Sequence, residues 1–570
     1  MTAPLAVAAC LVLYALGYVF YSRFLGSKVF ALDPDAPTPA HTLRDDVDYL
    51  PTRPAVLFGH HFASITGLAP MLGPAVAVIW GWLPAMIWVV FGAILVGSVH
   101  DFSALVLSVR HKGMSIGAIA EDLLGRRAKM LFHGIIFFGV SLAMGVFVIA
   151  ISGLLGWGAY PQAILPSAGL MIVAATIGVV LHRGKASLGP TTVAGFCLLL
   201  LLIYAAVKLD RFGVAEADWP SSQSIKLTLL GYGFLASVLP VWSLLQPRDF
   251  INSLLLYLGL GGMYLGFFMS GNDFAAPAVV MDAPGSPPML PFVFITIACG
   301  AASGFHALVA SGTTAKQLDR EVHARPIGYG AMIGESLLGL LAVIACTAGV
   351  LKPSAWEDGI YQSWQSIKGP GVALSNFIDG GASFLWEFGL PEDLARSFVA
   401  VVVVSFALTT LDSATRLLRY NVEEISSSAK MPCHRFVSSF IAVLAIAFFC
   451  FYRLRVESVG ADGSVVVTER EAGMTLWQLF GTTNQLLAAM TLMLATRYLS
   501  RRGPYAWVTG VPMLLILVST LFAMGTNLQR FIAADEGPLA VVGGVLLLMA
   551  AWLCVEGLLA LRRDARRGQG

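Results

Sequence analysis

Charged residues are scarce in this sequence. Asp, Glu, Lys and Arg make up 12% of its 570 residues, whereas hydrophobic residues make up 57%. A soluble domain of ordinary composition carries about 25% charged residues. So few charges cannot cover a soluble chain of this length, which excludes a soluble enzyme and a disordered scaffold. The net charge of +2 gives no reason to expect a nucleic acid as partner. The composition therefore indicates an integral membrane protein, whose partner is the lipid bilayer.

Cysteine and recognisable catalytic motifs are scarce as well. The chain has seven cysteines and no two are spaced as CxxC, so we interpret them as small buried side chains rather than disulfides or metal ligands. The absence of a P-loop leaves ATP-driven transport without support. We therefore expect a protein that is not an enzyme and carries no cofactor.

Long apolar runs dominate what is present. Because a helix needs about 20 apolar residues to cross a bilayer, the sequence predicts an all-α integral membrane protein with about fifteen transmembrane helices. The predicted spans are 3–21, 62–81, 83–109, 129–154, 162–181, 189–207, 227–245, 253–270, 290–311, 327–350, 396–411, 436–452, 475–496, 507–526 and 537–561. With the N-terminus outside and the C-terminus in the cytoplasm, most of the 36 Lys and Arg residues fall in cytoplasmic loops, as the positive-inside rule requires.

The predicted span 62–81 cannot be one straight helix. It holds Gly67, Pro70, Gly73 and Pro74, which remove hydrogen-bond donors and weaken helix formation. Irregular backbone at membrane depth is tolerated only where protein or a water-filled cavity surrounds it. The span therefore predicts a discontinuous helix.

The predicted span 227–245 has a related interruption, at Gly231-Tyr-Gly233 and again between Ser237 and Trp242. The two interrupted spans start five helices apart and run in opposite directions, which predicts two inverted five-helix repeats over 62–411. The alternative is that Gly and Pro are simply frequent in membrane helices.

Interrupted helices offer a way to bind a small anion. A half-helix that begins after a break presents free N–H groups and its positive dipole end, while freed carbonyls can hold a cation. The sequence therefore favours an anionic solute that is co-transported with H⁺ or Na⁺. The candidate substrate-binding residues are Ser64, Thr66, Gly67, Gly73, Ser237, Trp242 and Ser303.

Ionisable residues inside predicted spans are costly and mark functional sites by default. The candidates for proton or cation coupling are His61, His306, Asp101, Ser311, Thr313 and Thr314. Histidine titrates near physiological pH, and His61 is favoured because it stands beside the first half-helix. The alternative for each histidine is a hydrogen-bonded packing role.

A divalent metal is a further alternative, although no ligand spacing such as HExxH supports it. Its candidate ligands are His60, His61, His100 and His306.

Charged residues also gather at the cytoplasmic ends of several predicted spans. Asp412 and Arg416 are spaced i,i+4, as are Arg419 and Glu423, so each pair is expected to form a salt bridge on one helix face. They either anchor the helix ends or gate an inner vestibule. The candidate gating residues are Arg248, Asp249, Lys316, Asp412 and Arg416.

Several of these strings are long and unusual, and they carry a resemblance. They are Gly59–Gly67, His100–Phe102, Leu239–Asp249, Gly304–Ala307, Ser311–Gln317 and Thr410–Tyr420. At these positions the sequence resembles the carbon starvation protein A (CstA) family of bacterial inner-membrane transporters. The resemblance implies uptake of pyruvate or small peptides, with pyruvate uptake as proton symport. It also implies a relationship to the amino acid–polyamine–organocation superfamily and its LeuT-like core of two inverted five-helix repeats.

The sequence thus predicts a secondary transporter with three parts. Residues 1–61 form a first transmembrane helix and a cytoplasmic linker, 62–411 form the ten-helix inverted-repeat core, and 412–570 add four further transmembrane helices. The alternatives are a membrane sensor for pyruvate or peptide and a metal-containing membrane protein. The choice of H⁺ or Na⁺, the preferred solute and the oligomeric state stay open.

Overall fold

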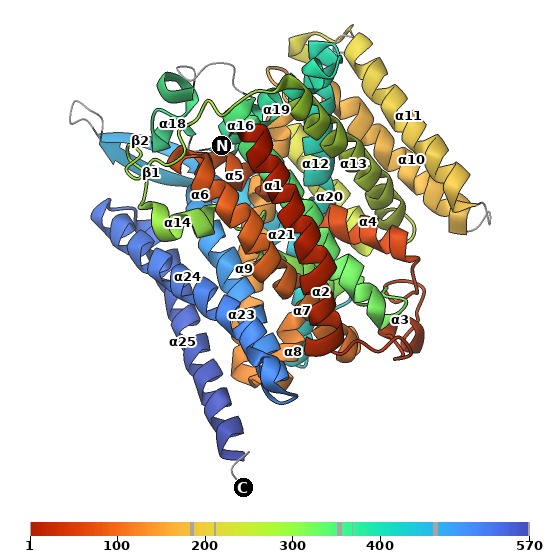
Figure 1. Ribbon diagram of the computed structural model, residues 1–570. Helices are drawn as coiled ribbons and strands as arrows, with labels where there is room; N and C mark the ends of the chain where they lie inside the picture. Colours follow the sequence, from red (N-terminus) through yellow and green to blue (C-terminus); the bar gives the residue numbers. More distant parts are fainter. Residues whose placement is uncertain are drawn as a thin grey trace.

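The computed structural model describes residues 2–182, 187–209, 213–349, 356–367, 369–459 and 465–567. Within these ranges the chain is almost entirely helical (Figure 1). The exceptions are an isolated bridge and one antiparallel hairpin, formed by β1 (Arg453–Val459) and β2 (Val465–Glu471). The structure is therefore that of an all-α protein, as predicted.

The helices are labelled in chain order. They are α1 (Ala3–Leu16), α2 (Ser22–Phe24), α3 (Pro39–Thr42), α4 (Pro54–Ile65), α5 (Ala69–Ala77), α6 (Trp82–Ile87), α7 (Ser98–Arg110), α8 (Ile116–Leu123), α9 (Arg126–Leu154), α10 (Ile164–His182), α11 (Leu188–Lys208), α12 (Ser222–Val238), α13 (Leu245–Ser270), α14 (Met289–Thr296), α15 (Gly304–Val309), α16 (Ala331–Ala348), α18 (Trp364–Ile367), α19 (Pro370–Glu387), α20 (Glu392–Ser428), α21 (Arg435–Phe451), α22 (Ala472–Leu476), α23 (Phe480–Ser500), α24 (Trp507–Ala533) and α25 (Gly537–Arg567). Short π-helical stretches continue several of them, including Trp88–Gly97 between α6 and α7, and Ala310–Thr314 after α15.

Ten of the described helices are long and apolar enough to cross a membrane, and the bent pair α4–α5 makes an eleventh candidate. The predicted count of fifteen is not confirmed. The predicted spans that fall short are 227–245, 290–311, 436–452 and 475–496, which correspond to α12, the α14–α15 pair, α21 and α23. α12 and α21 have only 17 residues each. The predicted span 327–350 ends at a residue outside the described ranges.

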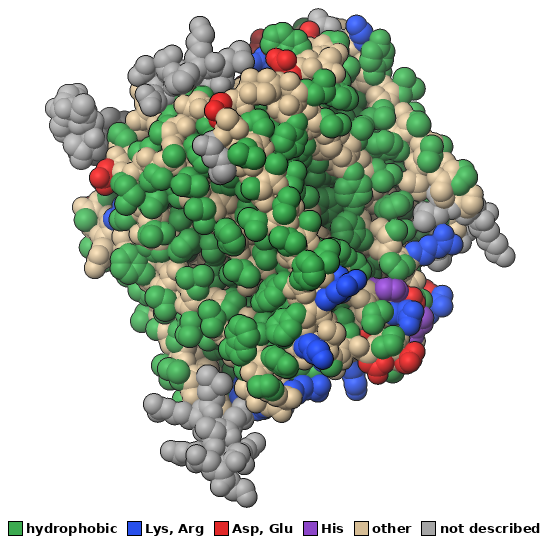
Figure 2. Space-filling model, viewed as in Figure 1, with side chains coloured by type: hydrophobic (Ala, Val, Ile, Leu, Met, Phe, Trp, Pro, Cys, Tyr) green, Lys and Arg blue, Asp and Glu red, His purple; other side chains and the backbone are tan. Residues whose placement is uncertain are grey.

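Apolar side chains cover most of the face shown in Figure 2. Charged groups gather at its edges, most densely at the lower right, where the linker between α2 and α4 lies in Figure 1. In water such a belt would be an aggregation hazard, whereas a bilayer covers it. We call the two ends of the helix bundle the Ala3 end and the linker end.

The first predicted break is confirmed. α4 and α5 meet at an angle of 48°, with Thr66 to Leu68 between them. The break lies nearer the middle of the helix pair than predicted, because α4 begins at Pro54 rather than at residue 62. His60 and His61 therefore lie inside a helix, not at its mouth.

The second predicted break is wrong. Gly231 and Gly233 lie within the continuous helix α12, where Gly233 faces Thr415 of α20. The chain leaves the helix only after Val238, and residues 239–244 connect α12 to α13. This turn lies at the linker end, since the Val241 N–H donates to the Val47 carbonyl over 3.3 Å.

The second interrupted span is formed instead by α14 and α15. The chain unwinds between Thr296 and Gly304, within a segment that the sequence predicts as one straight span, 290–311. Small residues allow this, because a Cβ on Gly97 would collide with the Ala301 carbonyl, and one on Gly73 with the Thr296 carbonyl. The unwound stretch is thus packed against α5 and the helix that precedes α7.

The two interrupted spans run in opposite directions. The Val280 N–H donates to the Trp80 carbonyl over 2.9 Å, which places the end of the first span beside the segment that leads into α14. The Thr52 N–H donates to the Gln317 carbonyl over 3.1 Å, which places the end of the second span beside the start of α4. The division at 411/412 stays a prediction, although α20 passes through it without a break.

Candidate substrate and coupling site

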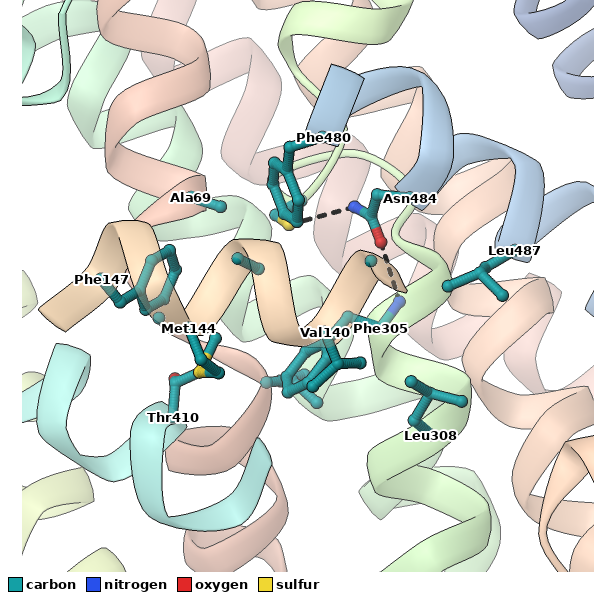
Figure 3. A pocket seen from close by; sticks show the side chains of 15 residues that line it. Ala69, Val140, Met144, Phe147, Phe305, Leu308, Thr410, Phe480, Asn484 and Leu487 are labelled. Carbon is teal, nitrogen blue, oxygen red and sulfur yellow. Dashed lines mark hydrogen bonds between the residues drawn. The ribbon is translucent and has the colours of Figure 1, made fainter. Parts of the chain in front are cut away.

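A closed cavity lies where the two interrupted spans meet (Figure 3). The first break contributes Ile65, Gly67 and Ala69 to its wall, and the second contributes Cys299. The remaining lining residues are Gly139, Val140, Ala143, Met144 and Phe147 of α9, Phe305 and Leu308 of α15, Thr410 of α20, and Phe480, Asn484 and Leu487 of α23. The backbone irregularity at membrane depth therefore borders a cavity, as such breaks usually do.

The cavity is small and mostly apolar. Its volume is about 30 Å³, in a measure in which one water molecule needs roughly 10–15 Å³. Asn484 and Thr410 are the polar side chains of its wall, together with the Cys299 thiol. A cavity of this size holds water but no organic solute.

Asn484 ties α23 to the second break. Its Oδ1 accepts the Phe305 N–H over 2.9 Å (Figure 3). Its Nδ2 donates to Ser303 Oγ over 3.0 Å. Nδ2 also lies 3.4 Å from the sulfur of Cys299. The amide thus satisfies a backbone donor that the unwound helix leaves open.

A chain of buried ionisable side chains runs beside this cavity. His100 Nδ1 lies 2.7 Å from Asp101 Oδ1, and His306 Nδ1 lies 2.8 Å from Asp101 Oδ2. Glu335 Oε2 of α16 lies 3.0 Å from His306 Nε2. All four side chains are 0% exposed. His306 sits between Phe305 and Leu308 of the cavity wall, so the chain and the cavity share the short helix α15.

Among these four buried side chains, Glu335 is the one that the sequence did not lead us to predict. Neither of its carboxylate oxygens makes a well-aligned hydrogen bond with a described residue. An acidic residue in the apolar stretch around Ile333 and Leu337 is itself the signal that could have found it. Buried charges are normally paired and hydrogen-bonded, so a carboxylate that faces only an imidazole indicates a functional group.

The other predicted coupling residues surround this chain. His61 Nδ1 lies 2.8 Å from Thr314 Oγ1, which joins α4 to the π-helical end of the second span. Ser311 donates to the Ala307 carbonyl and accepts the Ile116 N–H, and Thr313 donates to the Val309 carbonyl. Their hydroxyls are thus used within or between helices.

A second buried cluster joins α4, α12, α13 and α20. The Arg248 guanidinium pairs with the Asp412 carboxylate, and the Tyr232 hydroxyl donates to that carboxylate over 2.5 Å. His60 Nδ1 lies 2.5 Å from Asp249 Oδ2, and Ser64 Oγ lies 2.9 Å from Ser413 Oγ. In this cluster a permanent cation neutralises one of the two carboxylates.

The predicted Asp412–Arg416 pair is wrong, whereas the Arg419–Glu423 pair forms at 3.4 Å. Arg416 reaches Asp48 of the linker at 2.9 Å, and it also donates to the Ala236 and Leu239 carbonyls. Burial would raise the pKa of the Asp48 carboxyl, but Arg416, Lys316 and Arg419 outweigh burial and hold this pKa below its usual range. The gating candidates thus belong to two separate sets of contacts.

The predicted substrate-binding residues do not converge on one place. Gly67 lines the closed cavity, Ser303 hydrogen-bonds to Asn484, and the Thr66 hydroxyl is buried with no hydrogen bond to a described residue. Ser237 bonds its own helix at the Phe234 carbonyl, and Trp242 lines a groove at the linker end. Ser237 and Trp242 were predicted from the wrong break, which explains why they lie elsewhere. Gly73 packs on Thr296 and lines a second cavity, described below.

No cluster suited to a metal is present among the described residues. His60 and His61 contact different partners, Asp249 and Thr314, and His100 and His306 both face Asp101. The four histidines therefore contact three different partner residues rather than gathering around one point.

The sequence matches the family model described as "Carbon starvation protein CstA" over residues 2–361 and 360–523. The chain belongs to the CstA family. A relative from Campylobacter jejuni named "Peptide transporter CstA" is 32% identical over 93% of this chain and 80% of its own length. The "Pyruvate/proton symporter BtsT" of Escherichia coli is 32% identical over 92% of this chain and 81% of its own length. A Mycobacterium tuberculosis "Peptide transporter CstA" is 33% identical over 92% and 74%.

Solved structures resemble this CstA-family chain only loosely. A manganese transporter of Eremococcus coleocola is 13% identical with a TM-score of 0.47, over 91% of this chain and 99% of the other. Mhp1, a nucleobase-cation-symport-1 family transporter, is 14% identical with a TM-score of 0.37, over 92% and 97%. Similarity at this level carries no argument about fold, cargo or mechanism.

Proposed function

We propose that this CstA-family chain is a secondary transporter that takes up pyruvate or short peptides together with protons. The proposal rests on one observation: two antiparallel interrupted spans meet at a closed cavity. Beside this cavity lies the buried chain of side chains that begins at His100 and ends at Glu335. The names of the relatives, peptide transporters and a pyruvate/proton symporter, agree with it. They also favour a transporter over an enzyme or a sensor.

The membrane arrangement is part of the proposal. We place the chain in a bacterial inner membrane, with the Ala3 end outside and the linker end in the cytoplasm, because most Lys and Arg residues then lie inside. We also infer a LeuT-like inverted-repeat core whose two interrupted helices are α4–α5 and α14–α15. The predicted partner of the first span, 227–245, is replaced by α14–α15. The reason is that α4–α5 and α14–α15 line the same cavity, whereas no residue of 227–245 lines it.

Proton coupling is assigned to the Asp101–His306–Glu335 segment of the buried chain. With both carboxylates ionised and His306 protonated, the segment carries a single negative charge. One further proton, taken by Glu335, makes it neutral, and a small anion in the adjacent cavity then meets no repulsion from it. Loading of the proton and loading of the anion therefore favour each other, which is the requirement for symport.

His61 supports this step through its contact with Thr314. The side chain joins α4 of the first interrupted span to the end of the second one. Its buried Nε2 makes no hydrogen bond with a described residue. We infer that His61 passes protons between the buried chain and the cytoplasmic side.

Proteoliposomes that contain the full chain test the proposal. Labelled pyruvate and labelled dialanine are offered separately under an imposed proton gradient or an imposed sodium gradient. We expect accumulation of at least one solute with the proton gradient, and loss of that accumulation when a protonophore is added. Failure to accumulate either solute would contradict the transport proposal, and accumulation with sodium alone would contradict the assignment of the proton.

A further inference from the structure

A second cavity lies at the Ala3 end, directly above the closed one. It is lined by α5, by the end of α14, by Trp477 and Gln478, and by the last turns of α24. Its volume is about 170 Å³, below the roughly 300–1,000 Å³ of pockets for drug-sized ligands and adequate for a small acid. The two cavities share three lining residues, Ala69, Cys299 and Phe480. We call this second cavity the vestibule.

The vestibule carries one charge and several unused polar groups. Arg530 is the single charged side chain among the described residues of its wall, and it is exposed. Its guanidinium forms no ion pair or hydrogen bond with a described residue, and neither do the amides of Gln478 and Asn527. Trp477 and Phe292 supply an apolar surface beside them. A wall of this kind suits a small molecule with one carboxylate and an apolar body.

Phe480 separates the vestibule from the closed cavity. It begins α23 and stacks on Trp477, with ring centroids 4.7 Å apart and an angle of 10°. In Figure 3 its ring lies above the closed cavity, between Ala69 and Asn484. No lining residue other than Ala69, Cys299 and Phe480 faces both cavities, and of these only Phe480 has a large side chain that rotation can remove from the path.

We propose that the vestibule is an outer docking site for the carboxylate of the substrate, with Arg530 as its counter-ion, and that Phe480 must rotate to admit the substrate to the closed cavity. This inference rests on the proposed function, because it assumes that a carboxylate enters from the Ala3 end. It assigns a charged recognition residue on α24, outside the two interrupted spans. The shared chemistry is a carboxylate, whether that of pyruvate or the C-terminus of a short peptide.

The first arm of the test measures uptake kinetics at low ionic strength. In Arg530→Gln we expect KM to rise about tenfold, the effect of losing one charge-assisted hydrogen bond, with kcat nearly unchanged. Arg530→Lys should recover part of the loss, and the difference from wild type should shrink in high salt. Arg453→Gln is the matched control, because Arg453 is an exposed arginine on β1 that does not line the vestibule. Parallel runs with pyruvate and dialanine identify which carboxylate docks.

The second arm uses Cys299 as a native reporter and does not depend on transport. Cys299 is 5% exposed and faces both cavities. A membrane-impermeant methanethiosulfonate added from outside, with labelling of the Cys299 peptide read by mass spectrometry, reports opening from the vestibule. We expect Phe480→Ala to speed this labelling several-fold. Phe480→Leu serves if the alanine variant is not inserted, and Phe448→Ala, on the exposed side of α21, is the control.

The outcomes separate the two proposals. If wild type transports neither solute, the proposed function fails and the docking site with it. If wild type transports but Arg530→Gln keeps its KM at low salt, only the docking site is overturned. Unchanged labelling of Cys299 in Phe480→Ala and Phe480→Leu overturns the role of Phe480.

Discussion

Two buried charge clusters flank the interrupted spans, and they differ in the cation that balances them. In the Arg248–Asp412 cluster the cation is a guanidinium, which stays protonated at every physiological pH. In the Asp101–His306–Glu335 chain it is an imidazole that lies between two carboxylates, so the Glu335 carboxyl can take up a further proton. The first cluster therefore holds a fixed charge and binds helices together, whereas the second can change its charge during a transport cycle.

The strongest test of this difference is Glu335→Gln, which keeps the shape of the side chain and removes its titration. We expect proton-driven accumulation to fall to the level of protein-free liposomes, because the buried chain can no longer take up the extra proton. Exchange of labelled for unlabelled substrate across the membrane needs no net proton movement and should persist.

Two companion variants sharpen this test. Glu121→Gln removes an exposed carboxylate of α8 and should transport normally. His61→Gln should lose accumulation while it keeps exchange, if His61 conducts the proton. Normal accumulation in Glu335→Gln would contradict the coupling role of the buried chain, and normal accumulation in His61→Gln would leave His306 as the remaining histidine for the proton.

The next effect in size concerns stability in the other cluster. Asp412→Asn leaves Arg248 buried without its counter-charge, and breaking such a pair costs about 3–5 kcal/mol. We expect a large fall in the thermal unfolding temperature of the detergent-solubilised protein. Glu335→Gln should lower this temperature little, because it removes a buried charge, whereas Asp412→Asn leaves a buried charge without its partner. Equal losses in the two variants would remove the distinction between a fixed and a titratable cluster.

The smallest effect is expected at the linker, where Asp48 contacts Arg416 and Arg419. The lowered pKa of Asp48 means that its contribution to stability is present at neutral pH and is lost only as the pH falls through that value, below the ordinary value of about 3.9. Asp48 is therefore ionised at both pH 6 and pH 8. Protease cleavage of the linker in inside-out vesicles should occur at the same rate at these two pH values.

Asp48→Asn provides the contrast at the linker. We expect faster cleavage of this variant at both pH values, because the two arginines lose the negative charge that balances them. Cleavage of the wild-type linker that rises between pH 8 and pH 6 would contradict this assignment and point to a histidine such as His41, which contacts Asp319 at 2.9 Å.

The sequence was informative where a local rule operates. Gly67 and Pro70 disfavour an unbroken helix through their own backbone chemistry, so the first interruption could be predicted from local composition. The second could not, because residues 297–303 include no proline and unwind through contacts with Gly73 and Gly97, which are distant in sequence. The same limit applies to Asp412, whose partner is on α13 rather than one turn away. Glu335 is different, because an acidic residue inside an apolar predicted span is visible in the sequence, yet Glu335 was not among the predicted site residues.

The linker also has a mechanical consequence. Asp33 and Asp48 attach it to Glu321 and to α20, and Thr52 attaches it to Gln317. The linker therefore connects the end of the second interrupted span to α20, the longest of the described helices. Any opening at this end must stretch the linker or release these contacts. The speed of substrate release through this end would then depend on how fast the linker detaches as well as on the substrate.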